Sequence, residues 1–328
     1  MVRTNAPYRP AWISRIRSIR ALFRLLPYLF ALWRAAGRVE LFHVLANSGW
    51  AWYLIAVPAI LIARARRVPV IVNYRGGNAE AFFAGANSWA RKLLVSVDSL
   101  VVPSGFLKAV FQRLDCAARV IPNIVDLERF GPRAAPNPGS APHIVVTRNL
   151  ERIYDLPTAL RAFALVRKRF PNARMTVAGT GPELAALRAL SASLGVADAV
   201  VFAGRIDRRD VPALYQAAHL MINPSVVDNM PNSVLEAFAS NVPVVSTDVG
   251  GVSFIAEHDR TALLVPPGNP DAMAAAIERV LSEPGLSDRL ARAAREEAKR
   301  YAWASVRELW LTEYGRVSGV GRTAVEAM

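Results

Sequence analysis

Residues 223–239 read NPSVVDNMPNSVLEAFA, and the rest of the chain is interpreted outward from this stretch. A turn that contains a proline leads into a helix. Pro is favoured in the first helical turn, and Asp or Asn just before it is a good N-cap. On a helical wheel Val234, Leu235 and Phe238 fall on one face, which predicts that the helix packs on a sheet.

The opposite face of the same helix carries polar groups. Asn232 and Ser233 lie there with Glu236, and Asp228 precedes the helix. A helix N-terminus attracts anions, because its free N–H groups and its dipole favour negative charge. Two acids eight positions apart with open amides between them suit a ligand that carries both phosphate and sugar hydroxyls. An ordinary amphipathic helix capped by Asp or Asn is the alternative.

The composition of the chain restricts the number of domains and the kinds of site that it can contain. A chain of 328 residues, 53% of them hydrophobic, is long enough for two domains with real cores. Its one cysteine, Cys116, excludes an internal disulfide and fits a reducing compartment. The histidines are scattered and no Cys/His cluster has metal-ligand spacing, so we expect no metal site.

The net charge of +14 is concentrated near the start of the chain. Eight arginines precede Glu40, and the remaining residues carry an excess of +6. This indicates a local basic surface and not a nucleic-acid-binding protein. Residues 11–26 form a basic amphipathic helix that either lies on an anionic membrane surface or packs on its own domain. We expect no cleaved signal peptide, and residues 49–63 predict a buried helix because the run is short for a membrane span.

Strands and helices alternate along the rest of the chain. Strands are predicted at 39–45, 69–73, 99–103 and 119–121, and then at 143–147, 174–178, 200–202, 219–223, 243–247 and 262–265. A Pro- and Gly-rich segment at 131–142 predicts a linker. The alternation is typical of doubly wound parallel sheets, which bind ligands beyond the carboxyl ends of their strands. The glycine-rich turns fall at such ends.

Several of these segments together resemble the retaining glycosyltransferases of family four, which have the GT-B fold. The resemblance runs from about His43 to Gly315 and is strongest over 143–283. The residues that carry it are VIPNIVDLERF (120–130), Arg148, VAGTGPE (177–183), VFAGRI (201–206), the stretch 225–251 and LLVPPGNPDAMAAAI (263–277).

The resemblance implies two Rossmann-like doubly wound parallel-sheet domains that face a cleft. A shortened acceptor domain would span 39–130, and a nucleotide-sugar domain would span 143–300. Residues 1–38 would be a basic amphipathic segment, and 301–328 a helix that packs back toward the first domain. One or two βα units before His43 are missing relative to the family. This implies either a reduced domain or a start at an internal methionine.

The resemblance also implies roles for individual residues. Glu236 would bind the nucleotide ribose, Asp228 would face the donor sugar, and Arg148 would neutralise the diphosphate leaving group. The reaction would need no metal and no cofactor besides the donor substrate. Further donor contacts would come from Arg152, Asn229, Met230, Pro231, Asn232, Ser233, Gly179, Thr180, Gly181 and Arg205.

Three positions depart from the family pattern. Asp228 replaces the usual Glu, and Tyr154 and Asp155 stand where a Lys is common, with Arg152 as a substitute or a surface charge. The family often has a His after the strand at 69–73. This chain instead has Arg75, Gly76, Gly77 and Asn78, which predict an acceptor or cleft contact or, alternatively, a turn that needs glycine for positive φ.

The leading hypothesis is a hexosyltransferase that acts on a polysaccharide or glycolipid-precursor acceptor of the cell envelope. Its partners would be a nucleotide sugar and a saccharide or lipid-linked saccharide. It would be cytoplasmic, peripheral on the inner face of the membrane through residues 11–26, and would bind no nucleic acid. The alternatives are a non-catalytic GT-B subunit that binds nucleotide sugar, and a nucleotide-sugar epimerase, for which no acid and base set is evident.

Overall fold

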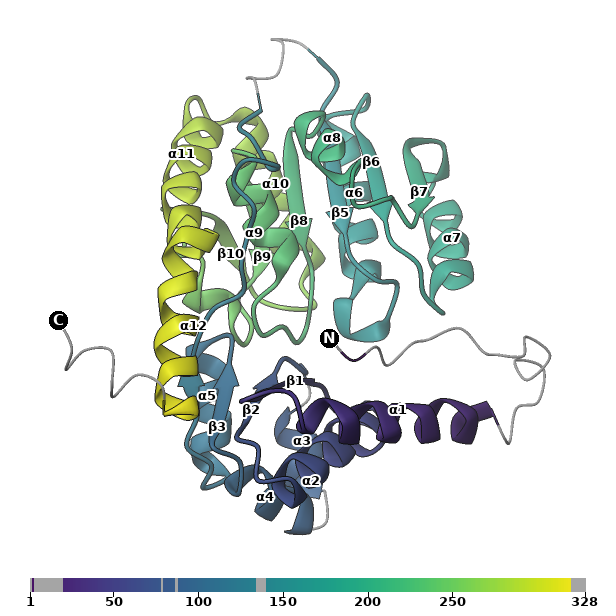
Figure 1. Cartoon of the computed structure of the whole chain (residues 1–328). Helices are drawn as coiled ribbons and strands as arrows, with labels where there is room; N and C mark the ends of the chain where they lie inside the picture. The colour runs from purple at the N-terminus through teal and green to yellow at the C-terminus, as the bar shows by residue number, and fades with distance from the viewer. Residues whose placement is uncertain (1, 3–19, 78, 86–87, 134–139, 320–328) are drawn as a thin grey trace, which may run out of the picture. The chain divides into compact units, whose positions relative to one another are not determined.

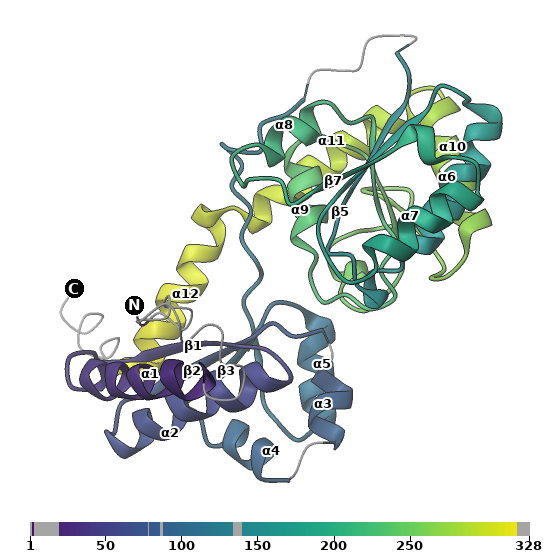
Figure 2. The same ribbon diagram turned by 90° about the vertical axis from the view of Figure 1, so that its right-hand side faces the viewer.

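The computed structural model describes residues 2, 20–77, 79–85, 88–133 and 140–319 (Figures 1 and 2). The chain divides into two compact units, unit 1 (Met1–Ile121 and Glu308–Met328) and unit 2 (Pro122–Arg307). Each unit contains its own parallel sheet, which confirms the predicted α/β class. Asn78, residues 11–19 of the predicted basic helix and 134–139 of the predicted linker lie outside the described residues. The domain limits inferred from the resemblance stay predictions.

Unit 1 is built on a four-stranded parallel sheet in the order β1-β2-β3-β4. The middle strand β2 is buried at every residue, whereas β1 alternates buried and exposed positions. In β1 the side chains of Phe42, Val44 and Ala46 enter the core. The strand bounds are Phe42–Ala46 (β1), Val70–Tyr74 (β2), Ser99–Val102 (β3) and Arg119–Val120 (β4), close to those predicted.

The helices of unit 1 fill the connections between these strands. Residues 49–63 contribute a π-helical turn and α2 between β1 and β2, so the predicted helix is present, but it is buried on one face only, since Trp50 and Leu61 are 79% and 52% exposed. The helix predicted to end at residue 26 instead continues to Ala36, because Tyr28 and Leu32 maintain the helical spacing and enter the core. The bounds are Arg20–Ala36 (α1), Trp52–Ala56 (the π turn), Val57–Ala65 (α2), Ala79–Gly85 (α3), Ser88–Val95 (α4) and Gly105–Arg113 (α5).

The last helix, α12 (Trp303–Ser318), packs on unit 1 through its carboxyl-terminal part. The ring of His43 in β1 lies 4.6 Å from that of Trp310, and its Nδ1 is 2.8 Å from the Tyr314 hydroxyl. Arg316 donates to the carbonyl of Asp98 at 3.2 Å. None of the helices in the described ranges is long and apolar enough to cross a membrane.

Unit 2 is built on a six-stranded parallel sheet in the order β10-β9-β8-β5-β6-β7. The chain starts at the centre with β5, runs outward to β7, and returns to the other side of β5 with β8. This reversal creates a switch point between β5 and β8, where doubly wound sheets bind ligands. The bounds are His143–Thr147 (β5), Arg174–Ala178 (β6), Val200–Gly204 (β7), Leu220–Asn223 (β8), Val244–Thr247 (β9) and Leu263–Val265 (β10).

Helices cover both faces of this sheet (Figure 2). Alternate strand residues separate the two cores: Ile144 and Val146 of β5 enter one and Val145 enters the other. The first core is closed by α6 (Leu156–Arg169), α7 (Leu184–Ser193) and α10 (Pro270–Ser282). The second is closed by α8 (Val211–Gln216), α9 (Asn232–Ala239) and α11 (Leu286–Ala298).

The start of α9 differs from the prediction. Pro231 is the N-cap and lies outside the first turn, and no side chain caps the helix, so neither Asp228 nor Asn229 is the predicted cap. The reason is that Asp228 is engaged elsewhere, in an ion pair with Arg148. Val234, Leu235 and Phe238 are fully buried as the wheel predicted. Ser233, predicted on the polar face, is 6% exposed, and its hydroxyl has no hydrogen-bond partner among the described residues.

Candidate active site

The loops that leave the carboxyl ends of β5, β6 and β7 are bonded to one another through their backbones. Arg148 N donates to Ala178 O at 3.1 Å, and Leu150 N donates to Thr180 O at 3.0 Å. Gly179 N in turn donates to Gly204 O at 2.8 Å. The turns that the sequence placed at strand ends therefore form one connected surface at the edge of the sheet.

Glycine is required in these loops because backbones approach closely. A Cβ at Gly179 would lie 1.9 Å from Arg148 O, and one at Gly181 would lie 2.3 Å from Leu150 O. Gly251, after β9, is tighter still, since its Cβ would lie 1.4 Å from Asn229 O. Gly251 N also donates to Asp228 O at 2.8 Å, which fixes the loop that precedes α9.

Arg148 is held on several sides at the switch point. Its Nε donates to Asn223 Oδ1 at 2.8 Å, its Nη2 forms an ion pair with the Asp228 carboxylate, and its Cζ lies 4.9 Å from the ring centre of Tyr154. The side chains of Arg148 and Asp228 are 11% and 10% exposed. Burial lowers the pKa of Arg148 to about 10, so the guanidinium stays charged at neutral pH.

Asn223 is itself held in place by hydrogen bonds to two buried serines. Its Nδ2 donates to Ser246 Oγ at 3.0 Å, and Ser225 Oγ donates to its Oδ1 at 3.0 Å. All three side chains are fully buried at the ends of β8 and β9. The guanidinium of Arg148 is therefore preorganised by the sheet itself.

Glu236 reaches the same edge from the first turns of α9. The Tyr215 hydroxyl lies 3.3 Å from Glu236 Oε2 and 2.7 Å from Thr147 Oγ1. Burial raises the pKa of the Glu236 carboxyl, although the Tyr215 hydrogen bond and the charge of Arg148 act in the opposite direction. The carboxylate is thus partly desolvated, which strengthens any hydrogen bond that it accepts from a ligand.

A cavity of 370 Å³ in unit 2 collects many of these groups. Its basic side chains, Arg148 and Arg205, share it with the acidic Glu236. Such a lining can hold a ligand that is anionic at one end and rich in hydroxyls at the other. The full lining is Thr147, Arg148, Asn149, Ala178, Gly179, Thr180, Arg205, Ile206, Val211 and Glu236.

Other predicted donor contacts lie elsewhere. Arg152 is exposed, lies 3.6 Å from Glu183, and lines a separate 210 Å³ cavity of unit 2. Met230 and Pro231 are buried, whereas Asn232 is exposed. Met230 is tied down by the segment before β5, because Asn123 Nδ2 donates to its carbonyl at 2.9 Å.

The sequence did not predict the residues that hold Arg148 and Glu236 in place through hydrogen bonds. Tyr215 and Asn223 carried a weak signal at most: one is an aromatic in a helix and the other is the last residue of a strand. Tyr154 was noticed only as a departure from the family pattern. Asp155, its neighbour, is the N-cap of α6 and accepts from Thr158 N, which explains why an acid stands there.

In unit 1, Arg75 and Gly76 follow β2 as predicted. Arg75 Nε donates to Asn73 Oδ1 at 3.4 Å, and Asn73 Nδ2 lies 3.2 Å from His43 Nε2. Burial and the charge of Arg75 lower the pKa of His43 to about 4. Gly76 has no positive φ, and a Cβ there would lie 2.6 Å from the Tyr74 hydroxyl. Space is therefore the reason for a glycine at position 76.

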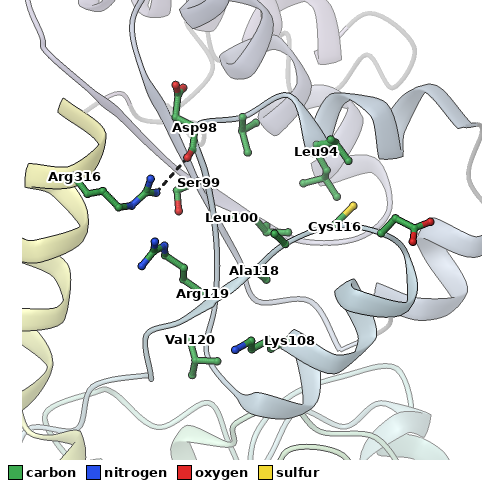
Figure 3. Close-up of a pocket in the computed structure, with 14 residues that line it drawn as sticks. Leu94, Asp98, Ser99, Leu100, Lys108, Cys116, Ala118, Arg119, Val120 and Arg316 are labelled. Atoms are coloured by element: carbon green, nitrogen blue, oxygen red, sulfur yellow. Dashed lines mark hydrogen bonds between the residues drawn. The ribbon is translucent and has the colours of Figure 1, made fainter. Parts of the chain in front are cut away.

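A cavity of 860 Å³ in unit 1 contains none of the predicted site residues (Figure 3). Lys108, Arg119 and Arg316 reach into it, with Arg316 bonded to the Asp98 carbonyl. Arg119 and Arg316 also pair with the buried Glu313. The Arg119–Glu313 pair and the Arg316–Asp98 hydrogen bond thus attach α12 to unit 1. Across the described ranges, no group of three or more His, Cys, Asp or Glu side chains is placed to hold a metal.

Two family models match the chain. Residues 132–297 match the model described as Glycosyl transferases group 1, and residues 4–129 match the model described as Glycosyltransferase Family 4. Together they extend over both units and include every predicted site residue. The candidate donor residues Arg148, Asp228 and Glu236 all lie within the first match.

Curated relatives support the same family. A D-inositol 3-phosphate glycosyltransferase of Acidothermus cellulolyticus is 35% identical over 228 residues, covering 68% of this chain and 49% of that protein. A glycogen synthase of Mycobacterium tuberculosis is 27% identical over 271 residues, covering 77% and 64%. An uncharacterized glycosyltransferase of Methanocaldococcus jannaschii is 33% identical over 148 residues, covering 45% and 38%. The chain thus covers less than two thirds of each of these relatives.

Solved structures share the fold at low sequence identity. A sucrose-phosphate synthase from Thermosynechococcus elongatus has a TM-score of 0.77 at 21% identity, covering 96% of this chain and 81% of that one. Anabaena HepE in complex with UDP-glucose has a TM-score of 0.77 at 16% identity, covering 88% and 82%. These matches, with the two parallel sheets, confirm the predicted GT-B fold.

Proposed function

The chain belongs to the family of glycosyl transferases group 1, and on that premise we propose that it transfers a sugar from a nucleotide-diphosphate sugar to a saccharide acceptor. The observation that carries the proposal is the unit 2 cavity in which Arg148 and Arg205 lie with Glu236. The proposal agrees with the HepE structure, whose ligand is UDP-glucose.

The donor would bind with its diphosphate against Arg148 and Arg205 of the cavity. Breaking the bond between sugar and phosphate builds negative charge on the diphosphate, and a fixed guanidinium stabilises that charge where it develops. Arg148 is fixed by Asn223 and Tyr154 before any ligand arrives. Glu236, in the same cavity, would accept hydrogen bonds from the ribose hydroxyls.

Asp228 would change partner when the donor binds. Its carboxylate pairs with Arg148 Nη2 in this structure, the group that a diphosphate would also contact. Competition for Arg148 would free the carboxylate to face the sugar ring, whose transition state carries positive charge. The loop that holds Asp228 would stay in place, because Gly251 N binds the Asp228 carbonyl.

The acceptor we propose is a polysaccharide or a lipid-linked saccharide of the cell envelope, held by Arg75, Gly76 and Gly77 of unit 1. The protein would then act at the cytoplasmic face of a membrane as a peripheral enzyme. The support is the polar turn at the end of β2 and the basic amphipathic start of the chain.

Donor binding can be tested with a thermal-shift panel of UDP, GDP and ADP and their sugars. A nucleotide at 100-fold excess over its Kd stabilises the folded state by about 2.7 kcal/mol. Arg148→Ala and Glu236→Ala should abolish the shift. Arg188→Ala, in the exposed part of α7, is the matched control and should keep it. A panel without any shift would contradict donor binding.

A donor-hydrolysis assay separates the enzyme from a non-catalytic subunit that only binds nucleotide sugar. Tyr154, in place of the Lys that the family commonly has, is the observation that favours the second candidate. Slow hydrolysis that is lost in Arg148→Ala supports transfer. A thermal shift without hydrolysis or transfer supports the binding subunit.

A further inference from the structure

Helix α1 has a second apolar face in addition to the one it buries. Tyr28, Leu32 and Ala36 point into the core of unit 1, and the Tyr28 hydroxyl donates to Ile55 O at 3.0 Å. On a different face, Leu26, Phe30 and Trp33 remain 61%, 63% and 48% exposed. Their spacing of i, i+4 and i+7 places them in one stripe along the helix.

Guanidinium groups lie over both aromatic rings of this stripe. Arg34 Cζ is 5.7 Å from the centre of the Phe30 ring, and Arg66 Cζ is 4.9 Å from that of Trp33. Arg66 comes from the end of α2, so two elements build the pattern. A cation beside a partly exposed aromatic ring is the arrangement of side chains that sit at an apolar–water boundary.

The charge around the stripe has one sign. Residues 20–79 contain eight arginines and a single acid, Glu40. Unit 1 as a whole carries 19 basic and 7 acidic residues, a net +12, whereas unit 2 carries 21 and 19, a net +2. Nearly all of the excess charge of the protein therefore belongs to the unit that exposes this stripe.

We propose that the stripe of Leu26, Phe30 and Trp33, with Arg34 and Arg66, docks unit 1 onto an anionic lipid surface. The apolar side chains would enter the boundary between headgroups and acyl chains, and the arginines would bind lipid phosphates. The inference rests on the membrane location in the proposed function and deepens it by naming the surface that docks, whereas it does not depend on donor binding or sugar transfer.

A lipid surface fits the stripe better than a protein partner does. The stripe offers three apolar side chains along about 10 Å of one helix, whereas a stable protein interface uses roughly 20–30 residues a side. A membrane needs no matching shape, and its continuous negative charge complements a patch with one acid among many arginines. An interfacial helix with its axis parallel to the membrane also needs no membrane-spanning length.

The test is co-sedimentation of the full chain with vesicles of phosphatidylcholine alone or with 30% phosphatidylglycerol added, a composition chosen for the assay. Wild-type protein should bind the anionic vesicles and lose binding with rising salt. Phe30→Ser with Trp33→Ser should weaken binding at least about tenfold. Arg34→Gln with Arg66→Gln should weaken it about fivefold per arginine and reduce its salt dependence.

Phe254→Ser with Trp303→Ser is the matched control, because these side chains are 55% and 54% exposed and belong to unit 2. That variant should bind vesicles like wild type. A thermal shift with nucleotide shows whether each variant is folded, and separates a failure of docking from a failure of donor binding. The proposal is overturned if the stripe variant binds anionic vesicles normally, if neutral vesicles bind equally well, or if the stripe variant loses self-association instead.

Discussion

The contacts of Arg148 are set by residues that are distant in the sequence. The resemblance predicted an arginine after the first strand of the second domain, and the structure places it beside Asn223, Asp228 and Tyr154. The pairing with Asp228 could not be predicted, because it depends on how the loop before α9 folds back, 80 residues further along the chain. The spacing of residues in the sequence predicts which side chains are neighbours within a helix. It does not predict contacts across a switch point, because these depend on the conformations of several loops.

Tyr154 should act on the donor through Arg148. A cation–π contact is worth roughly 0.5–2 kcal/mol, more when it is desolvated. Tyr154→Ala should therefore raise the nucleotide Kd about 3- to 30-fold, whereas Tyr154→Phe, which keeps the ring, should stay near wild type. Isothermal titration with the preferred nucleotide measures both. Equal losses in Phe and Ala would show that the hydroxyl matters and not the ring.

Replacing Glu236 by Gln should stabilise the fold near neutral pH but weaken nucleotide binding. Because burial raises its pKa, the folded state holds a proton more tightly than the unfolded state does. Its contribution to stability is therefore largest below its unfolded pKa and is lost as pH rises through its folded pKa. Glu236→Gln should raise the free energy of unfolding near pH 7.5, with little change near pH 4, and should weaken nucleotide binding. Urea unfolding at both pH values checks this, and a less stable Gln variant at pH 7.5 would contradict it.

At the scale of elements, periodicity and turn residues predicted most of the sheet. Strand β5, for example, begins and ends where predicted, because a continuous apolar run bounded by Pro142 and Arg148 reads plainly as a buried strand. The start of α9 was predicted wrongly, since Asp228 forms an ion pair that local preference does not include. The length of α1 was also missed, because its amphipathic pattern continues past Pro27.

The loop after β9 should tolerate no side chain at Gly251. A Cβ there would lie 1.4 Å from Asn229 O, so either the loop before α9 or the β9 turn must move. Gly251→Ala should cost at least about 2 kcal/mol of unfolding free energy and abolish nucleotide binding. Gly268→Ala is the control: its φ is +67° but nothing lies within 4 Å, so only about 1 kcal/mol of backbone strain is expected. Similar behaviour of the two variants in urea unfolding would be evidence against the close approach.

At the scale of the whole molecule, the candidate donor cavity and the excess positive charge belong to different units. The candidate donor cavity belongs to unit 2, which is nearly neutral, and the basic excess belongs to unit 1. The sequence alone indicated the charge asymmetry and the two parallel sheets. It did not indicate the stripe on α1, because exposure depends on which face of the helix the core of unit 1 takes.

Separate cores predict separate responses to ligand. Unit 1 has its own hydrophobic cluster, and unit 2 has two, one on each face of its sheet, so we expect calorimetry to resolve two transitions. A nucleotide at 100-fold excess over its Kd stabilises only the unit that binds it, by about 2.7 kcal/mol, which should raise the melting temperature of unit 2 by about 5–10 °C. Arg148→Ala should remove this shift, whereas Phe30→Ser with Trp33→Ser should leave it intact. A nucleotide that raised both transitions equally would mean that donor binding is coupled to unit 1, and the donor site could then not be assigned to unit 2 alone.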